Sequence, residues 1–475
     1  MNRAIASVSL LLVLLLAACS PQGPQASQAP QVDTDSLGTI AAATVDALLA
    51  LTQTAQAQPE ATLTQPPTPA LTPEVTPAVA ATAELPADAG MDLKVAYSDG
   101  QGNLWFWQSG SDPLQLTASG DVADFALSPD GGKIFFARAA GYVTDSLWLI
   151  DTDGSNEREV MAAADFEALD RPAQASGTSP AQLGWVPGSA TAVFTTYHYF
   201  DGPGFDPGDD LRLVNGSTGA VTTLLEPGEG GGMYFYSPDG AQIALVTPNQ
   251  IDLINSDGSN RRGGVLVYED ILMYTESPFY AQPVWAADGS RLRVVIPAKD
   301  RLGNPDEPGS VWEVPAAGGA AFKVLEFSTN GLGPGAFVSP DLNTLVYFQN
   351  VGTGGQQELH IASLDGSADE VYASGSLNWV GWAEDGPRFV WTQFGQVGAD
   401  RQAYLGQAGQ SPVLLGAPQS PLDLAWVAGD RFLFLDNDGG APPAWTLYLG
   451  TVGGPNQVVA EIAAGNQIPR FDFVH

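Results

Sequence analysis

The stretch SPDGGKIFFAR (residues 128–138) joins the turn sequence Ser-Pro-Asp-Gly to a short apolar segment. Nearly the same stretch, YSPDGAQIALV, returns at residues 236–246. Asp-Gly favours a tight turn because glycine tolerates positive φ, and the apolar residues that follow favour a strand. A turn and strand repeated at a long interval indicate an internal repeat, and that repeat decides the fold.

Five further segments follow the same pattern of an apolar strand, a turn and a second strand. With the first two they make seven copies, whose turns are spaced by roughly 44 to 58 residues. The copies begin at Val122, Leu183, Met233, Gln282, Gly335, Val380 and Leu424.

A second hairpin follows the first, as in LWLIDTDGSNEREV (residues 147–160), IDLINSDGSNRRGGVLV (251–267) and LHIASLDGSADEVY (359–372). Each unit therefore predicts four short antiparallel strands with Asp-Gly turns. Four strands in a repeat of about 40 to 50 residues are typical of a propeller blade.

The two ends of this region complete each other. KVAYSDGQGNLWFWQSGSDPLQLT (residues 94–117) predicts the last three strands of a blade, and NQIPRFDFVH (466–475) predicts a first strand with nothing after it. Their pairing would close a ring and remove its open sheet edges. The sequence thus predicts an all-β propeller of four-stranded antiparallel blades over residues 91–475. Eight blades are favoured, and seven is the alternative if the copy around Trp185 is an insertion.

SPDG after an aromatic or apolar strand, followed by LWLIDTDGSNE, resembles the WD40-like (PD40) repeat of TolB-type propellers. The resemblance covers about residues 91–475 and implies the fold. It implies little about function, because the repeat occurs in periplasmic scaffolds, peptidases and lipoproteins. SPDG is replaced at residues 186–188 and 428–430, and the blade count differs from the six expected of TolB, so the role of TolB is not carried over.

Composition and charge narrow the classes of partner. The 475 residues include 54 Gly and 36 Pro, which suits short strands joined by tight turns. Acidic residues number 53 against 18 basic ones, giving a net charge of −35. That balance argues against nucleic acid and anionic lipid as direct partners, since both need a positive surface. It suits an exported protein or a cationic ligand.

The chain begins MNRAIASVSLLLVLLLAACS, with a basic start, an apolar run and small residues. Leu16-Ala17-Ala18-Cys19 resembles the lipobox of bacterial lipoproteins, and Cys19 is the single cysteine. The resemblance implies a signal peptide over residues 1–18 and lipid attachment at Cys19, which would anchor the protein stably in the cell envelope, outside the cytoplasm. The alternative is an ordinary signal peptide with a cysteine nearby by chance.

Residues 19–90 are rich in Pro, Thr, Ala and Gln and poor in charge. Such a segment buries too little apolar area to fold and is predicted to be an extended tether. Residues 36–57 could form a short helix within it.

No hydrolase, zinc or nucleotide-binding signature is present: the sequence contains no G-x-S-x-G, no HExxH and no P-loop. We therefore expect that the chain is not an enzyme, with no catalytic residue and no cofactor. A carbohydrate- or peptide-processing enzyme with a carboxylate site at the central channel is the alternative.

DTDGSNE (residues 151–157) resembles the start of a calcium-binding loop, but the twelfth position of such a loop would be Ala162 instead of Glu. Other repeats read NSDGSNRR and SLDGSADE at this place, which favours a plain turn between strands. Calcium is a weak expectation, and no metal ligand is predicted.

The long connections fall between the second and third strands of a blade and between successive blades, which places them on one face of the ring. Loops on a rigid scaffold commonly carry recognition. Two are rich in aromatic and acidic residues, which suit a cationic peptide or basic protein surface. The candidate binding residues are Tyr197, His198, Tyr199, Phe200, Phe205, Asp206, Asp209 and Asp210 in one, and Tyr268, Glu269, Asp270, Tyr274, Phe279 and Tyr280 in the other.

An alternative for each of these residues is that the aromatics cap the blades and the acids form a solvated rim. His198 is expected to be a surface polar residue. Trp185, Trp285, Trp382 and Trp426 end first strands and are expected to pack between adjacent blades. The predicted function is a lipid-anchored binding or scaffold module. Its expected partner is an envelope protein, a cationic peptide or a glycan, with no nucleic acid and with membrane contact through the lipid only.

Overall fold

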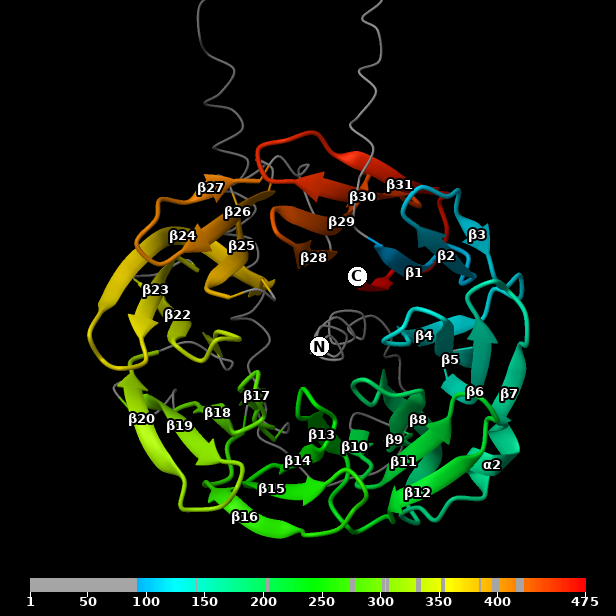
Figure 1. Cartoon of the computed structure of the whole chain (residues 1–475), viewed down its shortest axis with the longest axis horizontal. Coiled ribbons are helices and arrows are strands. Elements are labelled where there is room, and N and C mark those ends of the chain that lie inside the picture. Colours follow the sequence, from blue (N-terminus) through cyan, green and yellow to red (C-terminus); the bar gives the residue numbers. More distant parts are fainter. Residues whose placement is uncertain are drawn as a thin grey trace, which may run out of the picture. The chain divides into compact units, whose positions relative to one another are not determined.

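The computed structural model consists almost entirely of antiparallel sheets that follow one another around a ring (Figure 1). It describes residues 92–141, 143–201, 205–272, 278–300, 304, 307–329, 335–351, 355–383, 386–394, 401–415 and 423–475, without the side chains of 205–207. The predicted signal peptide, Cys19 and the predicted tether lie outside this range. In the part that the structure describes, none of the helices has the length and apolar character needed to cross a bilayer.

The strand pairings of the described residues give seven sheets. The seven-stranded sheet consists of two groups of strands that share β24 (Asp369–Trp382). We number the resulting groups blades 1 to 8 in chain order. Blade 1 contains β32 (Phe471–Val474), β1 (Lys94–Ser98), β2 (Leu104–Gln108) and β3 (Leu114–Gln115). Blade 2 contains β4 (Val122–Leu127), β5 (Lys133–Ala140), β6 (Val143–Asp151) and β7 (Arg158–Met161). Blade 3 contains β8 (Ala175–Trp185), β9 (Thr191–Phe200), β11 (Leu211–Asn215) and β12 (Val221–Leu225), with β10 (Phe205–Pro207) added beside β9.

The remaining blades have the same order, and a short helix, α2 (Ala163–Glu167), lies between blades 2 and 3. Blade 4 contains β13 (Met233–Tyr236), β14 (Gln242–Thr247), β15 (Gln250–Asn255) and β16 (Arg262–Val267). Blade 5 contains β17 (Val284–Trp285), β18 (Arg291–Ile296), β19 (Gly309–Pro315) and β20 (Phe322–Phe327). Blades 6 and 7 contain β21 (Ala336–Val338), β22 (Thr344–Asn350), β23 (Gln357–Ser363), the shared β24 (Asp369–Trp382), β25 (Arg388–Phe394), β26 (Arg401–Gln407) and β27 (Val413–Leu414). Blade 8 contains β28 (Asp423–Ala428), β29 (Arg431–Asn437), β30 (Trp445–Thr451) and β31 (Gln457–Ile462). The predicted class, an all-β propeller of four-stranded antiparallel blades, is confirmed.

The C-terminal strand pairs with the N-terminal strand of the described region. β32 lies antiparallel to β1, with Val474 opposite Lys94 and Phe471 opposite Tyr97. The backbone N–H of Leu127 in blade 2 donates to the Asp472 carboxylate at 2.7 Å. The last strand therefore belongs to blade 1 and also contacts blade 2.

The hydrophobic core is divided among the junctions between blades. Each of the eight clusters of buried apolar residues in the described region draws on two neighbouring blades, including one that joins blade 8 to blade 1. Trp185 and Trp285 lie at two junctions, where their indole N–H groups donate to Ala126 O at 3.0 Å and Phe235 O at 3.1 Å of the preceding blade. Their predicted packing between blades is confirmed. Trp382 contacts the cluster between blades 6 and 7, and Trp426 belongs to the cluster between blades 7 and 8, so their predicted packing is confirmed as well. The indole N–H of Trp426 donates within its own blade, to Gly429 O.

Side-chain hydrogen bonds explain the repeated Ser-Pro-Asp-Gly turn. Ser128 Oγ accepts from the N–H of Lys133 at 2.9 Å and donates to Asp130, which in turn accepts from Gly132 N. The same pattern recurs at Ser237 and Ser339. The fourth turn residue has positive φ: 64° at Gly131, 69° at Gly240 and 61° at Leu342. The turn is thus specified locally, by Ser, Asp and usually Gly.

The tight turns of each blade lie on one face of the ring. In blade 2 the N–H of Thr152, in the turn after the third strand, donates to Gly132 O in the turn after the first. Equivalent bonds run from Ser256 N to Ala241 O and from Val452 N to Asp430 O. We call this side the turn face and the opposite side, which carries the long connections, the loop face.

Gly240→Ala is expected to destabilise the propeller more than Gly188→Ala. Both glycines have positive φ, 69° and 67°, which costs an alanine about 1 kcal/mol or more. A Cβ at 240 would also lie 2.7 Å from the backbone oxygen of Pro187 in blade 3, whereas nothing lies within 4 Å of one at 188. Urea unfolding of both variants measures the difference. Equal losses would show that the blades do not approach this closely.

Candidate functional site

The first of the two predicted binding loops is built mainly of strand. β9 continues to Phe200 because the alternating, β-favouring residues of TAVFTTYHYF do not stop at Tyr197. It pairs with β8 along this length, with Tyr197 opposite Ser179 and Phe200 opposite Ala175. β10 pairs on its other side, with Phe205 opposite Tyr199 and Asp206 opposite His198. The predicted loop at 197–210 is therefore corrected: it is a three-stranded extension of blade 3 on the loop face, which we call the hairpin extension.

Successive side chains of β9 point to opposite faces of the sheet, so the aromatic residues of the hairpin extension differ in exposure. Tyr197 and Tyr199 are partly exposed, and their ring centroids are 6.5 Å apart. Tyr199 lies over Gly177, where a Cβ would be 2.0 Å from the tyrosine hydroxyl. His198 is buried, and its Nδ1 lies 3.1 Å from Thr178 Oγ1. The expectation of a surface histidine is thus wrong, because residue 198 faces the opposite side of the strand from its tyrosine neighbours.

A buried ion pair lies at the base of the hairpin extension. The Asp210 side chain is 1% exposed and that of Arg212 is 9% exposed, with 2.7 Å between Oδ2 and Nε. Asp210 Oδ1 also accepts from Thr196 N at 2.9 Å and from Thr196 Oγ1 at 3.0 Å. Asp210 therefore holds β9 and β11 together and is not available to a partner. Asp209 beside it is partly exposed, and its carbonyl accepts from Gly231 N at 2.5 Å.

The second predicted loop, residues 268–282, links blade 4 to blade 5. Phe279 is buried in the core of that junction, and Tyr268 packs against it with 6.2 Å between ring centroids. The Tyr268 hydroxyl donates to Thr247 O at 2.9 Å, and burial raises the pKa of this hydroxyl. These two residues cap the blades, the alternative that the sequence left open. Tyr280 is partly exposed, and Tyr274 lies outside the described residues.

Acidic groups remain exposed on this link. Glu269 and Asp270 are exposed, and Glu269 forms an ion pair with Lys299 from the loop of blade 5, a contact that raises the pKa of Lys299. Leu272 is 59% exposed. On the hairpin extension, Asp201 is exposed at the end of β9. The sequence interpretation missed Leu272 and Asp201, because nothing in residue type separates an exposed loop residue from a buried one.

Carboxylates also occur on the first strands of the blades, where the alternative enzyme site was expected. Asp124 of β4 lies 2.8 Å from Arg470 Nη1, and Asp472 of β32 accepts from Leu127 N. Near them the Tyr234 hydroxyl donates to Gln182 O, and burial raises the pKa of Tyr234, with the charge of Asp124 contributing. Each of these three side chains therefore has a bonding partner in the structure: Arg470 for Asp124, the Leu127 amide for Asp472 and the Gln182 carbonyl for Tyr234.

The acidic turn at residues 151–157 uses its oxygens internally. Asp153 Oδ1 accepts from Ser155 N at 2.9 Å, and Asp151 Oδ2 accepts from Asn156 Nδ2 at 2.7 Å. Among the residues with described positions, no group of three or more His, Cys, Asp or Glu side chains could hold a metal ion. Calcium at this turn stays a weak prediction.

No family model matches the sequence, and none of the curated proteins matches it. The fold is similar to several solved propellers. An oligogalacturonate lyase in complex with manganese is 15% identical, with a TM-score of 0.38 over 66% of this chain and 81% of its own. TolB from Acinetobacter baumannii is 17% identical, with a TM-score of 0.30 over 58% of this chain and 62% of its own. Porphyromonas gingivalis dipeptidyl peptidase 4 is 12% identical, with a TM-score of 0.48 over 71% of this chain and 52% of its own. At these identities the likeness concerns the fold alone, and the expected likeness to TolB-type propellers is confirmed at that level.

These similar structures correct one expectation. The chain was expected not to be an enzyme, because signatures of known hydrolases are absent from its sequence. The lyase and the peptidase among the similar structures are enzymes. The expectation is therefore contradicted, because enzymes share this fold. A propeller of this kind is shared by binding proteins and by enzymes.

Proposed function

We propose that the protein is a lipid-anchored, extracytoplasmic propeller that binds a basic protein surface or a cationic peptide through its loop face. The observation that carries the proposal is the hairpin extension, which presents Tyr197 and Tyr199 on a rigid strand beside the exposed carboxylate of Asp201. Partly exposed tyrosines beside carboxylates suit Lys and Arg side chains, which can both pair with the acids and stack on the rings.

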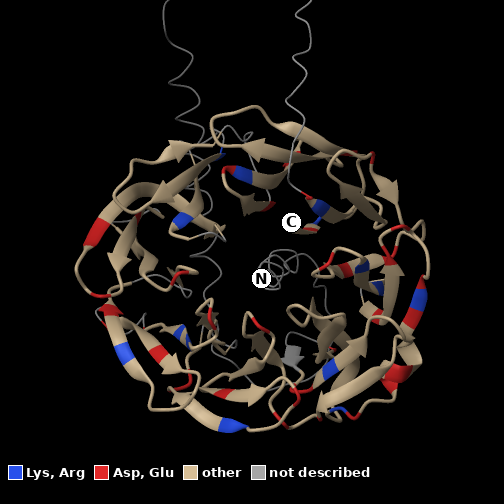
Figure 2. Ribbon diagram, in the orientation of Figure 1, with Lys and Arg blue, Asp and Glu red and all other residues tan. Residues whose placement is uncertain are grey.

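The charge of the whole molecule supports a cationic partner. The net charge is −35, and Figure 2 shows acidic residues distributed around the ring, with basic residues among them. A field of one sign speeds the association of a partner of opposite sign and disfavours acidic competitors. Glu269, Asp270 and Leu272 would extend the contact surface toward blade 5.

The anchor and its tether belong to the same proposal. Lipid attached at Cys19 would hold the protein to the bacterial envelope, and residues 20–90 would place the propeller away from the membrane surface. A cationic partner would then be retained at the envelope. The proposal requires no metal and no cofactor.

The test uses the full-length protein and a short peptide of alternating Arg and Ser, with an Asp-Ser peptide as the probe of opposite charge. Binding of the Arg-Ser peptide is expected at low salt and should weaken as salt screens the charges. The double variant Asp201→Asn/Asp270→Asn should weaken binding roughly fivefold, because each exposed charge contributes about 0.5 kcal/mol. Isothermal titration calorimetry gives the dissociation constants.

The matched control is Glu159→Gln/Glu370→Gln, which removes two exposed charges from the outer strands β7 and β24. It should change the affinity by less than about twofold. Equal losses in both double variants would mean that the peptide responds only to net charge, and the loop face would then not be its binding site.

A further inference from the structure

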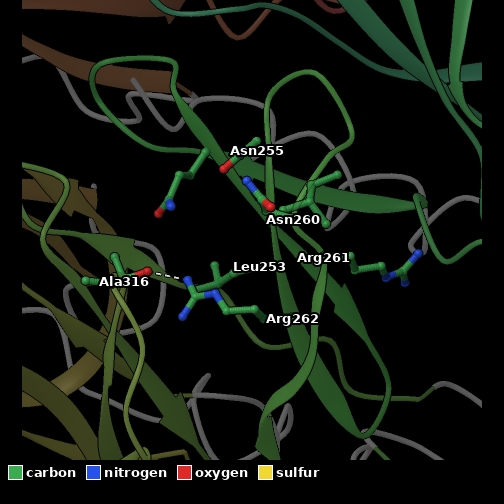
Figure 3. A pocket seen from close by; sticks show the side chains of 9 residues that line it. Leu253, Asn255, Asn260, Arg261, Arg262 and Ala316 are labelled. Atoms are coloured by element: carbon green, nitrogen blue, oxygen red, sulfur yellow. Dashed lines mark hydrogen bonds between the residues drawn. The ribbon is translucent and has the colours of Figure 1, made fainter.

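A cavity of about 430 Å³ opens on the turn face between blades 4 and 5. Its walls are the turn between β15 and β16, with Asn255, Asn260, Arg261 and Arg262, and the turn after β19, with Ala316 (Figure 3). This is the face opposite to the one proposed for the partner. A cavity of this volume accommodates a small organic molecule.

The lining of this cavity has a charge unlike that of the chain. Its nine residues include two arginines and no Asp or Glu, in a protein where acids outnumber bases 53 to 18. Arg261 is neutralised by Asp252, with 2.8 Å between Nη2 and Oδ2, and it also donates to Glu229 O. Arg262 donates to Ala316 O and has no carboxylate partner among the described residues. One guanidinium charge is therefore left facing the cavity.

The repeats show that the residues around this charge differ in blade 4, although blade 2 has an arginine, Arg158, at the position of Arg262. The same turn reads DTDGSNER in blade 2 and SLDGSADE in blade 6, against NSDGSNRR here. Asn255 and Arg261 thus stand where blade 2 has Asp151 and Glu157. In blade 6 the positions of Arg261 and Arg262 are occupied by acids. At two positions of this turn blade 4 therefore has an amide and a guanidinium where blade 2 has carboxylates, while Asp257 is retained.

The side chains on the wall can donate several hydrogen bonds. Asn260 has a positive φ of 54°, and its side chain lies beside Asn255 at the cavity (Figure 3). No partner of the Asn260 amide is found among the described residues, whereas Asn255 Nδ2 donates to Ser259 Oγ at 2.9 Å. A guanidinium and a nearby primary amide match the two oxygens of a carboxylate, and a second amide can accept from a hydroxyl or N–H group.

We propose that this cavity binds a small organic carboxylate, which Arg262 holds by its charge and Asn260 by its amide N–H. Two sources share this chemistry: a sugar acid and the C-terminal carboxylate of a peptide. The site is separate from the loop face, so a ligand here would bind beside, and not in place of, the proposed basic partner.

Blade 2 provides a control for the structural role of Arg262. Arg158 occupies the equivalent position and likewise donates to the next blade, to Gly216 O at 2.7 Å. Arg158→Gln and Arg262→Gln each remove one bond between blades, but only Arg262 lines the cavity. A second variant, Asn260→Gly, removes the amide and keeps the backbone, because glycine readily adopts the positive φ of this position.

The experiment is calorimetric titration of the full-length protein with sodium glucuronate, acetyl-Ala-Ala, glucose and inorganic phosphate. We expect at least one carboxylate to bind at low salt and glucose not to bind. Arg262→Gln should weaken binding about tenfold or more, since a hydrogen bond to a charged group is lost, and Asn260→Gly should weaken it several-fold. Arg158→Gln should leave it unchanged.

Preference for glucuronate or for acetyl-Ala-Ala identifies the source of the carboxylate. Three results would overturn the proposal: no binding of either carboxylate up to about 10 mM, binding of phosphate alone, or an equal loss in Arg158→Gln and Arg262→Gln. If Arg262→Gln does not fold, Asn260→Gly provides the test. Unchanged carboxylate affinity in Asn260→Gly also contradicts binding at this cavity.

Discussion

Deletion of residues 471–475 is expected to unfold the propeller or to lower its free energy of unfolding by about 5 kcal/mol or more. The deletion removes β32, which supplies the first strand of blade 1. Phe473 is buried at the junction of blades 8 and 1, and Asp472 accepts from Leu127 N of blade 2. Its loss would therefore open a sheet edge and expose two of the junctions at once.

Phe473→Ala is the graded form of this test, with an expected loss of about 3 to 5 kcal/mol from the removal of a buried aromatic side chain. Phe322→Ala is the control, because that residue lies on the outer strand β20 and is 50% exposed. Urea unfolding followed by circular dichroism gives the free energy of unfolding of the truncated protein, Phe473→Ala and Phe322→Ala. A truncated protein with the midpoint of the intact one would contradict a propeller closed by its C-terminal strand.

Asp210→Ala is expected to cost about 3 to 5 kcal/mol, because it leaves Arg212 buried without a compensating charge. It also removes the acceptor of Thr196 N and Oγ1 at the base of the hairpin extension. Chemical denaturation measures the loss. The double change Asp210→Leu/Arg212→Met should recover most of it, since apolar side chains of similar size can replace a buried ion pair.

The control for the ion pair is Glu326→Gln, which breaks the exposed pair with Lys323 and should change stability by less than about 1 kcal/mol. If Asp210→Ala costs no more than this control, the pair is solvated and does not position the extension. If the double change is as unstable as Asp210→Ala, the carboxylate contributes through Thr196 and not through its charge.

Local rules account for what the sequence predicted correctly. The Ser-Pro-Asp-Gly turns are specified by hydrogen bonds within five residues, so their repetition is visible in one sequence. The two incomplete blades at residues 94–117 and 466–475 predicted the pairing of β1 with β32, because an unpaired strand edge is unfavourable. Trp185 and Trp285 end the first strands of their blades, and this position predicted their packing between blades.

The candidate site was harder to predict because burial depends on distant partners. In the sequence Asp210 is an acid in a polar stretch, but in the structure it is buried and bonded to Arg212 and to Thr196 of β9. His198 and Tyr199 are neighbours whose exposure differs only because β9 continues through them. The cavity at Arg262 needs Ala316 from the next blade, and only comparison of the repeated turns signals it in the sequence.

Photo-cross-linking of the Arg-Ser peptide to the full-length protein, with mapping of the attached residues, tests the proposed function most directly. The peptide would carry a photoreactive phenylalanine and be bound at low salt, where the charges are least screened. Cross-links at Tyr197, Tyr199 and Leu272 on the loop face are predicted. Cross-links at the turns around Asp130 and Asp239, or spread evenly over the ring, would contradict recognition through that face.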